Sequence, residues 1–150
     1  MTAQENKELY RRVVEDLNRG DLKAWLFAAP DSSFNGQPFG REGDRHRAEM
    51  LATAFPDQHY DILEMVAEGE MLAVRWRMTG THLGELAGPT MTIPATGKRL
   101  DMWGMSMYRI EDGMAKEIWE RFDMMEDLRQ LGVLPPPESS GEAGPTGDER

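Results

Sequence analysis

The spacing of apolar residues changes along this chain from a helical to an extended repeat, and this change constrains the fold most. Near the N-terminus Leu9, Val13 and Leu17 recur at four-residue steps, which places them on one face of a helix. From residue 60 onward apolar and polar residues alternate, as is typical of strands. The chain therefore predicts helices first and a sheet afterwards, which is the α+β class.

Three N-terminal helices are expected. A capping box that starts at Thr2 begins the first helix, and Gly20 follows its end. Asp21 can cap a short second helix, which Pro30 ends. A glycine-rich loop at residues 35–43 leads to the third helix. The apolar faces of the second and third helices consist of Leu22, Trp25 and Leu26, and of Ala48, Leu51 and Phe55, respectively.

Four strands joined mainly by hairpins are expected at residues 60–67, 71–82, 98–110 and 114–123. The turn at residues 111–113 contains an Asp-Gly pair, which tolerates positive φ. Residues 83–97 form a long loop, and loops of this length in small domains are usually functional or mobile. A last helical turn is expected after Asp123, with Gly132 as its stop.

An antiparallel sheet that coils around a helix makes a cone, and a cone has an interior. We therefore predict one domain over residues 1–132, a cone-shaped curved antiparallel sheet wrapped by the N-terminal helices around a ligand cavity. From Pro135 the composition changes to Pro, Gly, Ser and acidic residues without an apolar anchor. Residues 133–150 are accordingly expected to be a disordered tail.

Composition and motifs remove several functional classes. The formal net charge of −10 argues against nucleic acid or an anionic membrane as a partner, because both attract clustered Lys and Arg. The chain has no cysteine and no nucleotide-binding or HExxH motif. Its three histidines, His46, His59 and His82, are widely spaced, so we expect no metal site. Acid–base chemistry or plain binding remains, and cytoplasm is the expected compartment.

The last strand alternates between two faces. Alternation places Glu117, Trp119, Arg121 and Asp123 on one face and Lys116, Ile118, Glu120 and Phe122 on the other. The pattern alone buries Ile118 and Phe122 and leaves the first face in water. The neighbouring strands also have two faces of mixed polarity. This pattern is consistent with a sheet that holds helices and ligand on one face and a partner subunit on the other. The twelve methionines fit either an adaptable ligand cavity or simple filling of core gaps.

Several short motifs occur in a fixed order and together resemble a known family. They are residues 55–57 (FPD), 73–76 (AVRW), 80–85 (GTHLGE), 94–98 (PATGK), 108–113 (YRIEDG), 117–119 (EIW), Asp123 and 130–132 (QLG). This series resembles the SnoaL-like polyketide cyclase family, also called ester cyclases, within the nuclear transport factor 2-like superfamily. The resemblance spans roughly residues 9–132, which is nearly everything except the tail.

The resemblance implies a cone-shaped α+β barrel, frequently homo-oligomeric, with a pocket for a polycyclic polyketide. It also implies ring closure by intramolecular aldol condensation without metal or cofactor, with an aspartate on the final strand as acid/base. Asp123 occupies the matching position. That placement turns Glu117, Trp119 and Arg121 toward the cavity, against the interpretation from the pattern alone.

The resemblance also directs attention to other substrate-binding candidates. The aldol step needs a donor for the developing enolate oxygen, and Asn35, Trp103 and Arg121 are candidates for it. Met105 and Met107 hold positions that are polar and pocket-facing in the family, and His82 completes the set.

Two other functions remain open at this point. Some relatives take part in hydroxylating anthracycline-type rings with a partner reductase, and a non-catalytic small-molecule binder would use the same cone.

Overall fold

The computed structural model describes residues 1–21, 27–88 and 90–136. Three helices and eight strands are present in these residues. The helices are α1 (Ala3–Asn18), α2 (Gly40–Ala54) and α3 (Met124–Gln130). The strands are β1 (Ala28–Phe34), β2 (Gln37–Pro38), β3 (His59–Glu68), β4 (Met71–Thr81), β5 (Leu86–Ala87), β6 (Thr92–Ile93), β7 (Arg99–Glu111) and β8 (Met114–Phe122).

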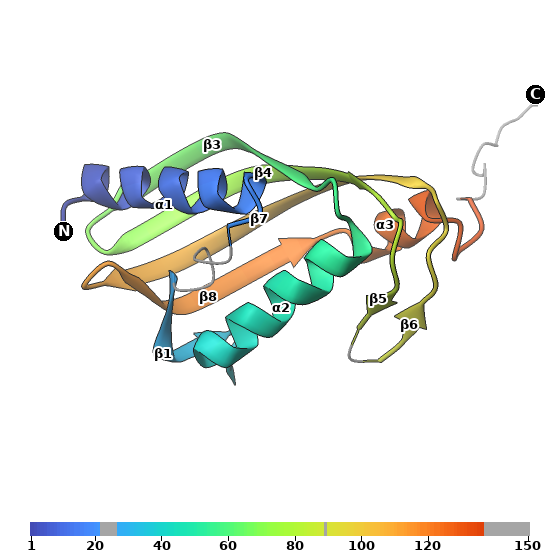
Figure 1. The fold of residues 1–150 in the computed structure, drawn as a ribbon. Helices are drawn as coiled ribbons and strands as arrows, with labels where there is room; N and C mark the ends of the chain where they lie inside the picture. Colours follow the sequence, from blue (N-terminus) through green and yellow to red (C-terminus); the bar gives the residue numbers. More distant parts are fainter. Residues whose placement is uncertain (22–26, 89, 137–150) are drawn as a thin grey trace, which may run out of the picture.

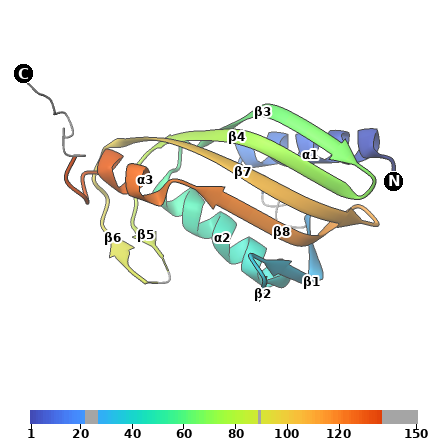
Figure 2. The same cartoon turned by 180° about the vertical axis from the view of Figure 1, so that it is seen from behind.

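Six strands form one curved sheet in the order β2-β1-β8-β7-β4-β3. Its neighbours are antiparallel except β1 and β8, which are parallel. Helices α1 and α2 cover one face of this sheet (Figure 1). The opposite face, seen in Figure 2, has no helix over strands β3, β4 and β7 in the described part of the chain. The expected α+β fold with a curved sheet is confirmed, although the sheet is mixed and open.

The prediction of a purely antiparallel sheet is wrong because it missed β1 and β2. Residues 28–34 lack a period-two pattern and contain Pro30, which was expected to end a helix. Pro30 fits in β1 because β1 pairs with β2 only at Ser33 and Phe34. Proline has no N–H to donate, and none is required for this pairing at position 30. Asn35 and Gly36 form the turn between the two strands with φ of 50° and 85°. An Asn-Gly pair is a strong hairpin signal, so this turn was detectable in the sequence.

The remaining expectations for secondary structure hold to within a residue or two at most ends. The Asp-Gly turn before β8 has φ of 52° at Asp112 and 75° at Gly113, as predicted. The long loop contains a small hairpin, β5–β6, that the sequence analysis did not predict. The second helix was expected on residues 22–26 and most of the disordered tail on residues 137–150; both lie outside the described residues.

The core lies between the two long helices and the inner face of the sheet. Helix α1 buries Tyr10 and Val14, and the C-terminal end of α2 is followed by the buried Phe55. Alternate residues of β4 face inward, namely Leu72, Val74, Trp76 and Met78. Each large apolar side chain buried in this way contributes about 1.5–3 kcal/mol. Among the described helices, none has the length and apolar character needed to cross a membrane.

Candidate functional site

A cavity of about 90 Å³ lies between α1, α2 and the inner face of the sheet. Much of its lining is apolar, from residues such as Val14, Leu51 and Ile118. Seven polar side chains also line it, and they come from helices, strands and a connecting turn that are distant in sequence. These are Tyr10, Asp44, Arg47, Gln58, Tyr60, Tyr108 and Glu120. A concave apolar site with a few convergent polar groups is the usual form of a small-molecule pocket.

An ion pair between α2 and β8 forms the polar centre of this cavity. The guanidinium of Arg47 donates to Oε1 of Glu120. The Glu120 side chain is 6% exposed and that of Arg47 is 31% exposed. The Arg47 guanidinium also lies over the ring of Phe34, 5.2 Å from its centroid. The pair therefore holds a positive and a negative charge at the wall of a mainly apolar space.

Ser106 on β7 connects this ion pair to the core. Its hydroxyl donates to Oε2 of Glu120 at 3.1 Å and accepts from Nε1 of Trp76 at 2.8 Å. The Trp76 ring takes up the space above Gly104, where an added Cβ would lie 2.3 Å from the ring. Glycine at this position thus allows the indole to reach Ser106, and the hydrogen bonds fix the orientation of the Glu120 carboxylate.

Asp44, on the first turns of α2, supplies a second carboxylate at the cavity. Burial raises the pKa of Asp44 to about 6, while the Arg47 guanidinium and the backbone N–H of Ala28 act in the opposite direction. A carboxyl group with this pKa exchanges its proton close to neutral pH. Such a group can both accept and return a proton in one reaction cycle.

Three tyrosines place hydroxyl groups around the same space. The Tyr108 hydroxyl donates to the Tyr10 hydroxyl at 3.2 Å. Burial raises the pKa of Tyr60 and of Tyr108 to about 12, and it raises the pKa of Tyr10 well above its ordinary value. All three phenols therefore stay protonated at neutral pH and can donate hydrogen bonds. Gln58 Oε1 is buried and accepts no hydrogen bond from the described residues.

The orientation expected for the final strand is wrong. Glu117, Trp119 and Arg121 lie on the outer face of the sheet, whereas Ile118 and Glu120 face the cavity. The hydrophobic pattern alone gave this arrangement, and the resemblance reversed it. The physical reason is that Ile118 joins the core, and alternation then sends Glu117, Trp119 and Arg121 outward.

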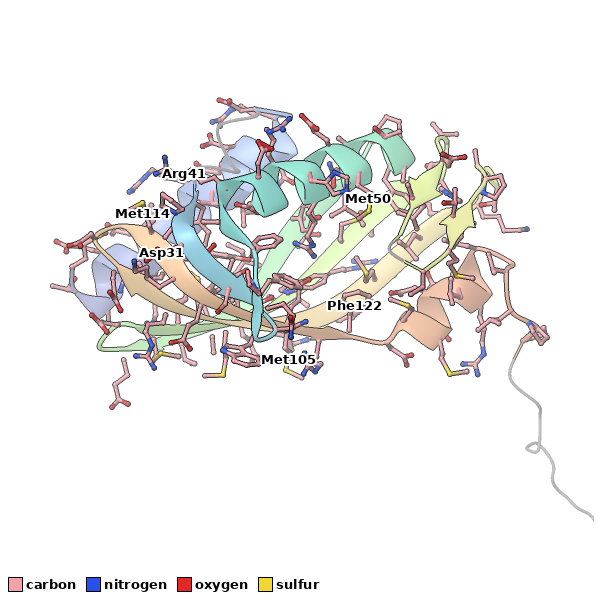
Figure 3. The ribbon with its side chains drawn as sticks, turned by 90° about the horizontal axis from the view of Figure 1, so that it is seen from below. Asp31, Arg41, Met50, Met105, Met114 and Phe122 are labelled. Atoms are coloured by element: carbon pink, nitrogen blue, oxygen red, sulfur yellow. The ribbon has the colours of Figure 1, made fainter. Side chains whose placement is uncertain are left out.

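The three candidates on β7 also lie outside the cavity. Trp103, Met105 and Met107 are exposed on the outer face, and Met105 points away from α2 (Figure 3). Leu100, Met102 and the other even-numbered residues of β7 face inward instead. Of the twelve methionines, Met102 is the one that lines the cavity among the described residues. The adaptable methionine cavity is therefore not what the structure contains.

Asn35 and His82 are placed differently again. Asn35 sits in the β1–β2 turn, and its Oδ1 accepts the backbone N–H of Glu120 at 2.9 Å, so it supports the strand that carries Glu120. His82 is fully buried beside the Phe55 ring, with Nδ1 3.0 Å from Oγ1 of Thr96. Burial lowers the pKa of His82, which favours the neutral ring. Neither residue lines the described part of the cavity.

Asp123 lies at the surface, where β8 ends and α3 begins. Its Oδ1 accepts the backbone N–H of Glu126 at 3.0 Å, which caps α3. The side chain is exposed and does not line the cavity, so the expected inward orientation is wrong. Its role as acid/base stays a prediction from the resemblance.

Sequence reasoning missed the residues that the fold brings together, and one signal for them was present. The alternation in β8 placed Glu120 on the same face as the apolar Ile118, and a carboxylate on an apolar face marks a functional candidate. No comparable signal distinguished Asp44 and Arg47 from the other charges of α2. Within the described residues, no three His, Asp or Glu side chains are grouped so that they could hold a metal ion.

A helix-covered curved sheet with a mixed apolar and polar cavity defines a class of small-molecule-binding α+β domains. A model of the SnoaL-like polyketide cyclase family matches residues 7–131. The chain belongs to this family.

Three similar proteins come from Streptomyces species. The chain is 29% identical over 133 residues to the aklanonic acid methyl ester cyclase DnrD of Streptomyces peucetius. The aligned region covers 83% of this chain and 89% of DnrD. AclR of Streptomyces galilaeus, a proposed hydroxylase, superposes with a TM-score of 0.80 at 28% identity over 95% of each chain. IdmH of Streptomyces antibioticus, a proposed polyketide cyclase, gives a TM-score of 0.70 at 28% identity over 85% of this chain and 99% of its own.

Proposed function

We propose that this protein is a cyclase that closes a ring in an aromatic polyketide or a similar polycarbonyl compound by intramolecular aldol condensation. The observation that carries the proposal is the pair of groups at the cavity wall, the Asp44 carboxyl with a pKa of about 6 and the Arg47 guanidinium. Similarity to an aklanonic acid methyl ester cyclase supports this substrate class.

The reaction would use Asp44 as the base. A methylene between two carbonyl groups is acidic, so a positioned carboxylate can remove its proton without a Schiff base. The resulting enolate carbon attacks a ketone carbonyl of the same molecule and forms the new carbon–carbon bond. The ketone oxygen becomes an alkoxide and takes up the proton that Asp44 had accepted. Substrate and product are isomers, so the reaction consumes no oxidant or reductant.

The other polar groups would stabilise the developing negative charge. Arg47 and the protonated hydroxyls of Tyr60 and Tyr10 line the same cavity as Asp44. Donors that are already oriented in a water-poor site stabilise an enolate oxygen more strongly than water does. Glu120 would act as a positioning residue because it holds the Arg47 guanidinium, with its own carboxylate oriented by Ser106.

The buried ion pair supports a functional interpretation for an energetic reason. Replacing such a pair with apolar residues of similar volume is often neutral or stabilising, so stability alone does not explain its presence. A site that binds and orients a polar substrate does explain it. The cavity of about 90 Å³ is smaller than the pockets of about 300–1,000 Å³ that hold drug-sized ligands. A polycyclic substrate therefore requires this cavity to widen.

The proposal is tested by incubating the protein with aklanonic acid methyl ester and following the ring-closed isomer by chromatography and mass spectrometry. Asp44→Asn should lower the rate by about 100-fold or more, since a positioned acid/base typically contributes this much. Asp112→Asn is a matched control, because its site is a hairpin turn with φ of 52° that asparagine tolerates. Wild-type activity that falls as the pH drops below about 6 would fit Asp44. Ring closure at an undiminished rate in Asp44→Asn would refute its role.

Asp123→Asn belongs in the same assay because the resemblance assigns the acid/base to Asp123. Asparagine is as good a helix cap as aspartate, so α3 should remain folded in this variant. Loss of activity in Asp123→Asn with full activity in Asp44→Asn would move the base from α2 to the end of β8. Inactivity of both variants would indicate that α3 rearranges when substrate binds.

A second candidate function is favoured by the similarity to AclR, a proposed hydroxylase. In that case the reaction would need oxygen and a reductant, so an assay under anaerobic conditions separates the two. A ligand that co-purifies and is released chemically unchanged would instead indicate a binding protein. A cytoplasmic location and the absence of nucleic-acid and membrane partners stay predictions from composition.

A further inference from the structure

Gln58 lies at one end of the cavity, in the turn between α2 and β3. Its backbone N–H donates to the carbonyl oxygen of Phe55 at 3.0 Å, and its Cα would lie 3.4 Å from a Cβ placed on Gly80 of β4. The backbone of this turn is therefore held between the end of α2 and β4. Figure 1 shows the chain leaving the C-terminal end of α2 here and entering β3. The side chain of Gln58 lines the cavity.

The Gln58 side chain carries an acceptor that the described residues leave unused. Its Oε1 is buried and accepts no hydrogen bond from them. Three other buried side-chain atoms in the described part of the chain also lack a partner, namely Oδ1 of Asn6, Nε2 of His82 and Oδ2 of Asp127, but none of these three residues lines the cavity. Buried polar atoms nearly always have a partner, so an unpaired acceptor in the wall of a cavity indicates the place of a ligand donor.

Stability alone does not explain a glutamine at this position. An unpaired buried carbonyl oxygen lowers the stability of the folded state, and an apolar side chain of the same length would avoid this cost. Apolar side chains such as Leu51 and Met102 line the same cavity. The indole N–H of Trp76 is a donor in the cavity wall, but it donates to Ser106 at 2.8 Å. The donor for Gln58 therefore has to come from a ligand.

Gln58 and Asp44 belong to opposite ends of the cavity. Asp44 and Leu51 both line it and are separated on α2 by about 10 Å along the helix axis. Gln58 follows the C-terminal end of this helix, on the side of Leu51. A long fused-ring molecule that places its reacting carbons at Asp44 and Arg47 therefore extends toward Gln58.

We propose that Gln58 is a specificity-determining residue that accepts a hydrogen bond from a hydroxyl group of the substrate, at the end remote from the carbons that form the new bond. The inference rests on the proposed function, since it takes the cavity as the polyketide site, and it narrows the substrate class to polycyclic ketones with a hydroxyl group at that end. A neutral alcohol or phenol can donate to an amide oxygen, whereas an ionised carboxylate can only accept. A site with a buried acceptor discriminates against an analogue that lacks the donor.

The test compares two unreactive ligands of nearly the same shape, 2-(hydroxymethyl)anthraquinone and 2-ethylanthraquinone. Both are tricyclic ketones without a methylene between carbonyl groups, so neither can undergo the proposed ring closure. Binding is followed by quenching of tryptophan fluorescence, since Trp76 lines the cavity. Gln58→Met keeps the length of the side chain and removes the acceptor. The ratio of the two dissociation constants should shift by about 10-fold toward the ethyl compound in Gln58→Met relative to the wild type.

Two controls separate this role from a structural one. Gln4→Met should leave the ratio as in the wild type, because Gln4 is exposed on α1 and does not line the cavity. 2-Methoxyanthraquinone accepts hydrogen bonds but cannot donate, so it should respond to Gln58→Met as the ethyl compound does. The melting temperature of Gln58→Met, measured by circular dichroism, should equal or exceed that of the wild type, because an unpaired buried acceptor has been removed. A lower melting temperature with an unchanged ratio would instead assign Gln58 to holding the turn.

An unchanged ratio in Gln58→Met overturns the inference, and so does a wild type that binds neither compound up to its solubility limit. These outcomes differ from failure of the proposed function. A shifted ratio without ring closure of aklanonic acid methyl ester would refute the cyclase and keep the role of Gln58. Ring closure with an unshifted ratio would do the opposite.

Discussion

The ion pair between Arg47 and Glu120 allows a quantitative test of the cavity, because each partner can be removed separately. Arg47→Met keeps an apolar side chain at this position but removes the guanidinium, which lies over the Phe34 ring. Glu120→Gln keeps the shape of the carboxylate and removes its charge. The double variant removes both charges, so neither side chain of the pair is left as an unpaired charge. Comparison of the four proteins gives the coupling free energy between the two side chains.

The expected magnitudes follow from the unequal burial of the two groups. Glu120 is 6% exposed, so Arg47→Met leaves a carboxylate that water scarcely reaches. Leaving one partner of a buried pair uncompensated typically costs about 3–5 kcal/mol. Because the Arg47 side chain is 31% exposed, the pair is partly screened, and we expect a loss of about 2–3 kcal/mol in the free energy of unfolding. Glu120→Gln should cost about 1–2 kcal/mol, since water can solvate the remaining guanidinium.

The measurement is urea unfolding followed by circular dichroism at neutral pH. A slope of about 1–3 kcal/mol per molar urea converts the loss in Arg47→Met into a midpoint lower by about 0.7–3 M. The double variant should lose no more than about 1 kcal/mol beyond Glu120→Gln, which gives a coupling of about 1–2 kcal/mol. Single effects that add to the double effect within about 0.5 kcal/mol would show that the pair is not formed in solution.

Three further predictions concern stability. Burial raises the pKa of Asp127 to about 7. The folded state therefore holds a proton that the unfolded state has lost, and stability should fall as the pH rises from about 4 to about 7. Asp127→Asn should raise the free energy of unfolding, measured with urea, by about 2 kcal/mol more at pH 8 than at pH 5. An equal change at the two pH values would contradict this. Gly104→Ala places a Cβ 2.3 Å from the Trp76 ring and should cost about 2–3 kcal/mol, with a change in tryptophan fluorescence. Asn35→Ala removes the hydrogen bond to the Glu120 backbone and places alanine at a φ of 50°, so it should cost about 1–2 kcal/mol in thermal melts. Asn35→Gly also removes the hydrogen bond but tolerates this φ, so it should cost less than Asn35→Ala.

The order of elements could be predicted from the sequence where the hydrophobic period was clear. Strands β3, β4, β7 and β8 have long alternating patterns, and their ends were predicted to within one residue. Strand β1 was missed because Pro30 and two serines hide any alternation. Its pairing with β8 is also parallel, and a parallel neighbour distant in sequence has no local signal. The Asn35-Gly36 turn was a local signal that was overlooked.

The candidate site could be predicted far less well, for a geometric reason. The cavity takes Tyr10 from α1, Asp44 from α2 and Tyr108 from β7, and sequence alone does not show that these elements meet. The resemblance supplied the family correctly but was not informative about which face of β8 points inward. The apolar Ile118 decided that question in the structure, as it had in the pattern.

A few side chains of β7 and β8 go against the usual distribution of polar and apolar residues. Facing inward, these strands carry Ser106 and Glu120 toward the cavity; facing outward, they carry Met107 and Trp119 into water. Both arrangements are unfavourable for an isolated folded monomer, since a buried carboxylate costs desolvation and an exposed indole forgoes burial. A polar substrate in the cavity would offset the cost on the inner face. Because side chains alternate along a strand, the register that points Glu120 at the cavity also places Trp119 on the outer face.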